Sequence, residues 1–232
     1  MGAGPIRFVK DIGLYAFSRG RATCKWRTRW CLRNCYNNKF YAVNPSLPDR
    51  DALDEAYWQK TSVDEFASAI KDLEVDRFRF SVRGEIWNNL RDVLKVQGIM
   101  KAAPDVLFWI PTRAWQDVGM MEHIEDLILP LDNARVLASM DPSVSGQMQE
   151  AIQDHGWAIL FVGDNEPRGQ LRLWHPVSGQ PRFYGCESRT AKMFRCPKLW
   201  EGRRGHCAVC TRGCFAPREP FHRIAVHLKG HR

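Results

Sequence analysis

The sequence predicts an α/β fold: a partial (βα)6 TIM-like barrel over residues 1–185, followed by a cysteine-rich C-terminal extension over residues 186–232. Short segments rich in β-branched and aromatic residues alternate with longer segments whose apolar residues recur at helical spacing. This alternation is typical of βαβ units and a parallel sheet. Because crossovers between parallel strands are right-handed, five or six such units curl into a full or partial barrel. The chain has 232 residues, 44% of them hydrophobic, so it can bury a core of this size.

The first predicted elements surround a loop that contains three cysteines. Residues 6–17 are strand-like, and the cysteine loop follows them directly. A helix is expected over residues 49–73, after the turn-forming segment Asn-Pro-Ser-Leu-Pro. Within this helical segment Thr61 or Ser62 is a candidate N-cap, and Glu65 lies three residues after Ser62, as in a capping box.

The later elements continue the alternation. Residues 77–82, Arg-Phe-Arg-Phe-Ser-Val, alternate polar and apolar residues as a half-buried strand does. A helix over residues 87–102 precedes a short buried strand at 106–110, which Pro111 ends. The same criteria predict helices over 116–129 and 145–155 and strands over 134–140 and 157–162, with a possible strand at 171–174 and a possible sixth strand at 183–184.

Basic charge accompanies the cysteines, although the net charge is only +8. Residues 12–48 contain seven Lys or Arg and no Asp or Glu, and residues 182–232 contain 12 basic and three acidic residues. Residues 49–181 contain no cysteine and have 13 basic and 22 acidic residues. Two explanations stay open: a nucleic-acid-binding surface, or cations that balance anionic, thiolate-ligated metal clusters.

The sequence contains no signal peptide, and no apolar run is long enough to span a bilayer. We therefore expect a cytoplasmic protein with no membrane partner. Cytoplasmic cysteines stay reduced, and seven of the eight cysteines lie in two groups. This grouping favours metal ligation over disulfides.

The first cysteine group consists of Cys24, Cys31 and Cys35. Three closely spaced thiolates can bind three irons of a [4Fe–4S] cluster and leave the fourth iron open to substrate. No His, Asp or Glu lies between Cys24 and Pro48 to complete a zinc site locally. Zinc completed by a distant residue and unligated structural thiols are the alternatives.

The cysteine loop and a later segment together resemble those of radical S-adenosylmethionine (SAM) proteins. The loop ends in Cys35-Tyr36, and the second strand leads into Ser-Val-Arg-Gly-Glu at residues 81–85. This combination more closely resembles the phage gene product 88 family, whose members carry a similarly spread three-cysteine loop, a Ser-x-x-Gly-acid segment and a cysteine-rich C-terminus. The cysteines here are separated by six and then three residues, whereas the usual radical SAM loop has three and then two.

The resemblance implies a barrel of the radical SAM type with its site at the C-terminal edge of the strands. A [4Fe–4S] cluster on the three cysteines would bind SAM, and its reduction would split SAM to give a radical that abstracts hydrogen from a substrate. Glu85 would accept a hydrogen bond from the SAM amino group, and Gly84 would allow close approach of the backbone. The residues implied near the SAM carboxylate or ribose are Arg113, Ser139 and Asp141.

The second cysteine group has enough thiols to close a metal coordination shell. Its members are Cys196, Cys207, Cys210 and Cys214, of which the last three form a Cys-x2-Cys-x3-Cys motif. A second [4Fe–4S] cluster and a structural zinc ion both fit this group. The remaining thiol, Cys186, has three interpretations: a ligand of either centre, a radical-relay thiol, or an inert buried cysteine.

The leading hypothesis is a radical SAM-like iron–sulfur protein, encoded by a phage and acting in the host cytoplasm on an unknown substrate. It would receive electrons from a donor such as flavodoxin or ferredoxin. Because the cysteine spacing is unusual, SAM cleavage and therefore enzymatic activity stay open. The alternatives are a non-enzymatic iron–sulfur or zinc protein whose basic segments bind nucleic acid, and an electron-transfer protein.

Overall fold

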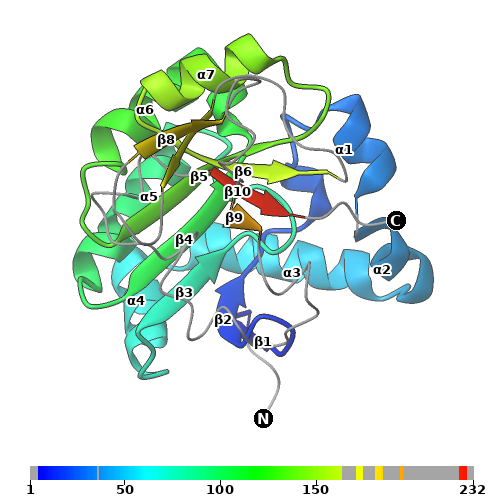
Figure 1. Cartoon of the computed structure of the whole chain (residues 1–232). Coiled ribbons are helices and arrows are strands. Elements are labelled where there is room, and N and C mark those ends of the chain that lie inside the picture. The colour runs from blue at the N-terminus through cyan, green and yellow to red at the C-terminus, as the bar shows by residue number, and fades with distance from the viewer. Residues whose placement is uncertain are drawn as a thin grey trace.

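Strands and helices alternate along most of the chain (Figure 1). The computed structural model describes residues 5–35 and 37–163, together with the backbone of residues 171–174, 181–184, 194–195 and 225–228. In chain order the elements are β1 (Arg7–Val9), β2 (Leu14–Phe17), the 3-10 helix η1 (Arg21–Thr23), α1 (Arg29–Asn34), α2 (Asn37–Val43), α3 (Leu47–Lys60), α4 (Val63–Lys71), β3 (Arg77–Phe80), α5 (Leu90–Ala102), β4 (Leu107–Thr112), the 3-10 helix η2 (Ala114–Gln116), α6 (Val118–Leu127), β5 (Ala134–Met140), α7 (Gly146–Asp154), β6 (Ala158–Val162), β7 (Leu171–Trp174), β8 (Pro181–Tyr184), β9 (Phe194–Arg195) and β10 (Ala225–Leu228).

The main sheet has eight strands in the order β1-β2-β3-β4-β5-β6-β10-β9. Neighbouring strands from β2 to β9 are parallel, and only β1 is antiparallel to its neighbour β2. The prediction of an α/β fold with a parallel sheet is confirmed. Among the described strands, β1 and β9 form the two ends of the sheet, so the finer prediction of a barrel stays a proposal.

The two faces of the sheet have different surroundings. Strands β2 to β6 lie side by side in chain order, so right-handed crossovers place their connecting helices on one face. In Figure 1, α4, α5, α6 and α7 follow one another around this side of the sheet. Phe78, Phe80 and Phe108 belong to the core on this side and are fully buried. Alternate residues such as Arg79 and Ser139 face the opposite side, because successive strand residues point to opposite faces.

Two predicted elements are each divided into two in the structure. The segment 6–17 forms a hairpin of β1 and β2, with Gly13 at φ 70° in the turn. The predicted helix over 49–73 is two helices, α3 and α4, separated at Ser62. The Ser62 hydroxyl accepts a hydrogen bond from the Glu65 N–H, and the Glu65 carboxylate accepts one from the Ser62 N–H. The predicted capping box is therefore present, and it starts a new helix where one continuous helix was expected.

The predicted strand at 183–184 is not the sixth strand of the main sheet. It lies in β8, which pairs only with β7 in a separate antiparallel sheet. The position next to β6 is taken by β10, which comes from the segment predicted to be a C-terminal extension. No helix within the described ranges is long and apolar enough to cross a membrane.

Two glycines bring the segments that follow β2 and β3 into contact. Gly20 and Gly84 have φ values of 94° and 78°, in the left-handed region. A Cβ atom on Gly84 would lie 2.1 Å from the carbonyl oxygen of Gly20, and one on Gly20 would lie 2.5 Å from the Asp51 side chain. Only glycine fits either position without moving the backbone.

We predict that Gly84→Ala lowers the free energy of unfolding by about 3 kcal/mol, because left-handed strain adds to the clash with Gly20. Urea unfolding followed by tryptophan fluorescence measures this loss. Gly156→Ala is the matched control: Gly156 has φ 86°, but nothing lies within 4 Å of an added Cβ. Its expected loss is about 1 kcal/mol, from strain alone. Equal losses in the two variants would contradict the contact as the cause.

Candidate functional site

A cavity of about 190 Å³ lies where β3, β4 and β5 end. Its lining comes from three sources: the cysteine loop with the start of α2, the ends of β3 and β4 with the segments that follow them, and residues of β5 and β6. The predicted site residues in the lining are Cys24, Cys31, Cys35, Gly84, Glu85, Arg113 and Ser139. Their positions match the expectation that functional residues gather at the C-terminal edge of parallel strands. The remaining thiols, Cys186, Cys196, Cys207, Cys210 and Cys214, lie outside the described residues.

The short helix α1 positions Cys31 at the cavity. Thr28 is its N-cap, and the Thr28 hydroxyl oxygen accepts a hydrogen bond from the Cys31 N–H at 3.0 Å. The same hydroxyl donates to Asp141 Oδ2 at 2.6 Å. Asp141 follows β5, has a fully buried side chain and is absent from the cavity lining. It therefore acts on the site by anchoring the helix that carries Cys31.

The three thiols of the cysteine loop are part-buried and form no disulfide. Burial raises the pKa of Cys24 to about 12, and the charges of Glu85 and the other two thiols add to the effect. Burial also raises the pKa of Cys31, against a lowering effect of Arg113. Both thiols therefore hold their protons at neutral pH, and a bound metal centre would have to displace these protons.

The arrangement of the thiols differs from that of a single-ion site. Within the described part of the chain, no group of three or more His, Cys, Asp or Glu side chains is arranged to hold one metal ion. A [4Fe–4S] cluster sets a different requirement, because each thiolate binds a different iron and the sulfurs need not surround one point. The described residues therefore hold no preformed single-ion site, and a cluster at the three thiols stays a prediction.

Glu85 is buried beneath the cavity, with 5% of its surface exposed. Its Oε1 accepts a hydrogen bond from the Ile86 N–H at 2.9 Å, and its Oε2 accepts one from the Arg113 N–H at 3.0 Å. Its own N–H donates to the Thr23 hydroxyl at 2.8 Å. Burial raises the pKa of Glu85 to about 7, although the hydrogen bonds to the carboxylate oppose this shift. The carboxyl group is held firmly and changes charge near neutral pH.

Arg113 and Asp141 form an ion pair beside the cavity, with Arg113 Nη1 2.9 Å from Asp141 Oδ2. Burial opposes the ionisation of Asp141, but hydrogen bonds from Ser143 and Thr28 and the charge of Arg113 hold its pKa below the ordinary value. A hydrogen bond from Arg113 also favours the thiolate form of Cys31. Arg113 therefore connects the predicted metal ligand to the end of β5.

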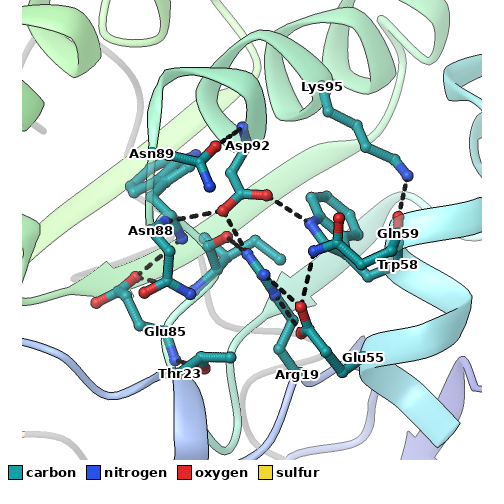
Figure 2. A network of polar contacts seen from close by, with 12 residues as sticks. Arg19, Thr23, Glu55, Trp58, Gln59, Glu85, Asn88, Asn89, Asp92 and Lys95 are labelled. Carbon is teal, nitrogen blue, oxygen red and sulfur yellow. Dashed lines mark hydrogen bonds and ion pairs between the residues drawn. The ribbon is translucent and has the colours of Figure 1, made fainter. Parts of the chain in front are cut away.

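A buried network beneath the site was not found by sequence reasoning (Figure 2). Arg19 follows β2 and donates to Asp92 Oδ2 at 2.6 Å, to Glu55 Oε2 at 2.7 Å and to the Ile86 carbonyl at 2.7 Å. Trp58 Nε1 donates to the second oxygen of Asp92 at 2.8 Å. These residues are far apart in the sequence and follow no motif. The weak signal in the sequence is an arginine placed directly after an apolar strand.

Comparison with known proteins gives one match. Residues 9–216 match the model of the gene product 88 family. No curated protein and no solved structure is significantly similar to the chain. The matched range includes the cysteine loop, the segment at 81–85 and all four thiols of the second cysteine group.

We predict that Glu85 makes the stability of the metal-free protein depend on pH. Its pKa is about 7 in the folded protein and 4.5 when unperturbed, so between these values the folded state retains a proton that the unfolded state releases. This contribution to stability is complete below pH about 4.5 and is lost as the pH rises through about 7. The shift corresponds to about 3 kcal/mol.

Urea unfolding of the reduced protein between about pH 5 and about pH 8 tests this prediction. Glu85→Gln is the control because it keeps the shape of the side chain and removes its titration. The free energy of unfolding of the wild type should fall with rising pH relative to that of the variant. Parallel pH profiles would show that Glu85 does not titrate in this range.

Proposed function

The chain belongs to the gene product 88 family, and we propose that it is a radical SAM-like protein whose three loop thiols bind a [4Fe–4S] cluster with one open iron. One observation carries the proposal: Cys24, Cys31 and Cys35 line the same cavity as Glu85 and Arg113. The two groups lie on segments far apart in the sequence and meet at the edge of the sheet where parallel α/β folds hold their active sites.

The surroundings of the thiols suit an anionic, thiolate-ligated cluster. Arg27 and Arg113 line the cavity, and their charges partly offset the burial that raises the pKa values of Cys24 and Cys31 respectively. Both effects favour the thiolate form that iron requires. Trp26 and Trp30 also line the cavity, and their indole rings would exclude water from a bound cluster.

SAM is the second component of the proposal. When bound, the reduced cluster would supply the electron for reductive cleavage of SAM. Glu85 would accept a hydrogen bond from the SAM amino group, because backbone N–H groups already hold its carboxylate in place. Arg113 and Ser139 line the cavity where they would contact the SAM carboxylate or ribose. Gly84 packs against the Gly20 backbone, and this contact draws the segment after β3 towards the cysteine loop. Gly84 would thereby bring Glu85 close to the bound SAM.

A second metal centre remains part of the proposal. We assign Cys196, Cys207, Cys210 and Cys214 to a further [4Fe–4S] cluster, with zinc as the alternative, and leave Cys186 without a role. An electron donor such as flavodoxin or ferredoxin would reduce the clusters in the cytoplasm of a phage-infected host.

An alternative function follows from the outer surface of the cysteine loop. Lys25, Arg27, Arg29 and Arg33 are exposed there, and the loop contains no acidic residue. Such a surface suits the phosphate backbone of a nucleic acid, with the metal centres acting as structural supports. A steep loss of DNA or RNA binding with rising salt, together with no SAM cleavage, would favour this function.

We predict that anaerobically purified protein is brown and contains about eight irons per chain, four from each cluster. Cys24→Ser, Cys31→Ser and Cys35→Ser should each lower the iron content by about four, because loss of one thiolate leaves the first cluster with two protein ligands. Iron and zinc analysis of the four proteins checks this. A colourless wild-type protein that contains zinc would contradict the proposal.

We predict that the reduced wild-type protein converts SAM to 5′-deoxyadenosine, and that Glu85→Gln lowers this activity at least about tenfold while keeping its iron. Gln is preferred to Ala because truncation would leave the N–H groups of Ile86 and Arg113 without an acceptor. Chromatography of the products and iron analysis of the same samples provide the two readouts. If Glu85→Gln loses iron instead, the proposed role of Glu85 in SAM binding is wrong.

A further inference from the structure

We infer that Arg79 and Ser81 form a receptor for an oxyanion, a carboxylate or a phosphate, on the substrate that shares the cavity with the cluster and SAM. This inference rests on the proposed function and adds to it the chemical class of the substrate. Arg79 and Ser81 line the cavity with the cysteine loop, and neither has a role in binding the cluster or SAM in the proposal above.

Among the described residues Arg79 lacks the acidic partner that five other buried or part-buried arginines have. Each of the others named here pairs with an Asp or Glu: Arg7 with Asp54, Arg19 with Glu55 and Asp92, Arg77 with Asp76, Arg83 with Asp51, and Arg113 with Asp141. Within the described residues Arg79 forms no ion pair, and its buried Nε–H has no hydrogen-bond partner. A part-buried guanidinium without an anion is costly unless a ligand supplies one.

Stacking on Trp109 fixes Arg79 and leaves its hydrogen-bonding edge free. The guanidinium carbon lies 4.1 Å from the centre of the Trp109 ring, which belongs to the neighbouring strand β4. A stacked guanidinium presents its N–H groups at the rim of its plane, where they match the two oxygens of a carboxylate or phosphate. Within the described part of the chain Arg79 donates a hydrogen bond to the Ser81 carbonyl, and at 3.5 Å it is weak.

Ser81 supplies a second polar group in the same wall of the cavity. It has 5% of its surface exposed, and its hydroxyl oxygen has no hydrogen-bond partner in the described residues. Its φ of 61° lies in the left-handed region, which residues other than glycine rarely adopt. Backbone strain of this kind is found where a side chain must be held for function. A ligand oxyanion would satisfy the Ser81 hydroxyl together with the Arg79 Nε–H.

The position of Arg79 separates the inferred receptor from the SAM site. Glu85 and Arg113 lie beyond the ends of β3 and β4, whereas Arg79 lies within β3 and is paired with Trp109 in the sheet. Arg113 already forms an ion pair with the Asp141 carboxylate. A molecule that reaches Arg79 must therefore extend from the cysteine loop into the face of the sheet. This is the position expected for a substrate placed next to SAM.

Calorimetric titration of the full-length reduced protein with inorganic phosphate and with malonate tests the inference. We expect saturable binding of one of the two anions, which identifies the phosphate or the carboxylate as the preferred group. Arg79→Gln should weaken this binding at least about tenfold, because it removes a charge-assisted hydrogen-bond donor. Arg79→Lys should weaken it less, since the charge remains, and Ser81→Ala should weaken it about threefold.

Arg77→Gln is the matched control. Arg77 lies two residues earlier on the same face of β3, but it pairs with Asp76 and is absent from the cavity lining. Its loss should leave anion binding unchanged. The inference is overturned if the wild type binds neither anion saturably, or if Arg77→Gln and Arg79→Gln weaken binding equally.

Iron content and SAM binding, measured on the same variants, separate this inference from the proposed function. Arg79→Gln should keep its iron and its affinity for SAM. A loss of SAM binding in this variant would assign Arg79 to the SAM carboxylate and overturn the inference. Arg79-dependent anion binding in a protein without iron would support the receptor and refute the cluster. SAM cleavage without Arg79-dependent anion binding would support the cluster and refute the receptor.

Discussion

The structure around the site depends on the burial of one charge, the guanidinium of Arg19. A buried arginine is stable only when its donors are paired, and here they are shared between Glu55 of α3, Asp92 of α5 and the carbonyl of Ile86 (Figure 2). The charges of the two acids outweigh burial and raise the pKa of Arg19 above its ordinary value. Because Arg19 directly precedes the cysteine loop and Ile86 directly follows Glu85, this network fixes both sides of the site relative to the helices.

The cysteine loop is attached to the sheet at two further points. Near its start, Gly20 and Gly84 pack backbone against backbone, which only glycine permits. Near its centre, the Thr28 hydroxyl donates to Asp141 at the end of β5 while it caps the helix that carries Cys31. Apart from α1 the loop is irregular, but these contacts give it a defined position before any ligand binds. A cofactor site requires such preorganisation, because flexible ligating side chains would lose conformational entropy when the cofactor binds.

Charge in the cavity is distributed so that an incoming cation and an incoming anion would meet different groups. Burial keeps the thiols of Cys24 and Cys31 protonated, with the pKa of Cys24 near 12, and brings Glu85 to a pKa of about 7. The thiols become strong metal ligands only when the positive charge of a metal replaces their protons. Arg113 is neutralised by Asp141, whereas Arg79, in the wall formed by the sheet, forms no ion pair with the described residues. The cavity therefore has thiols at the loop and a guanidinium at the sheet, which are the groups that the proposed cluster and the inferred oxyanion would bind.

The sequence by itself determined which residues form elements and which residue types lie at the strand ends. The strand at 134–140 has the predicted bounds, because hydrophobic periodicity is a local property of the chain. The candidate residues Glu85, Arg113 and Ser139 meet in one cavity, because the strands that they follow or belong to are parallel and end at the same edge of the sheet. Whether the cysteines bind a cluster stays a prediction. Only the tertiary structure decided that β10 occupies the place beside β6, that Arg19 supports the site and that no acid among the described residues pairs with Arg79. These features depend on pairing between residues distant in sequence, and no local pattern encodes which distant group a strand or a charge will meet.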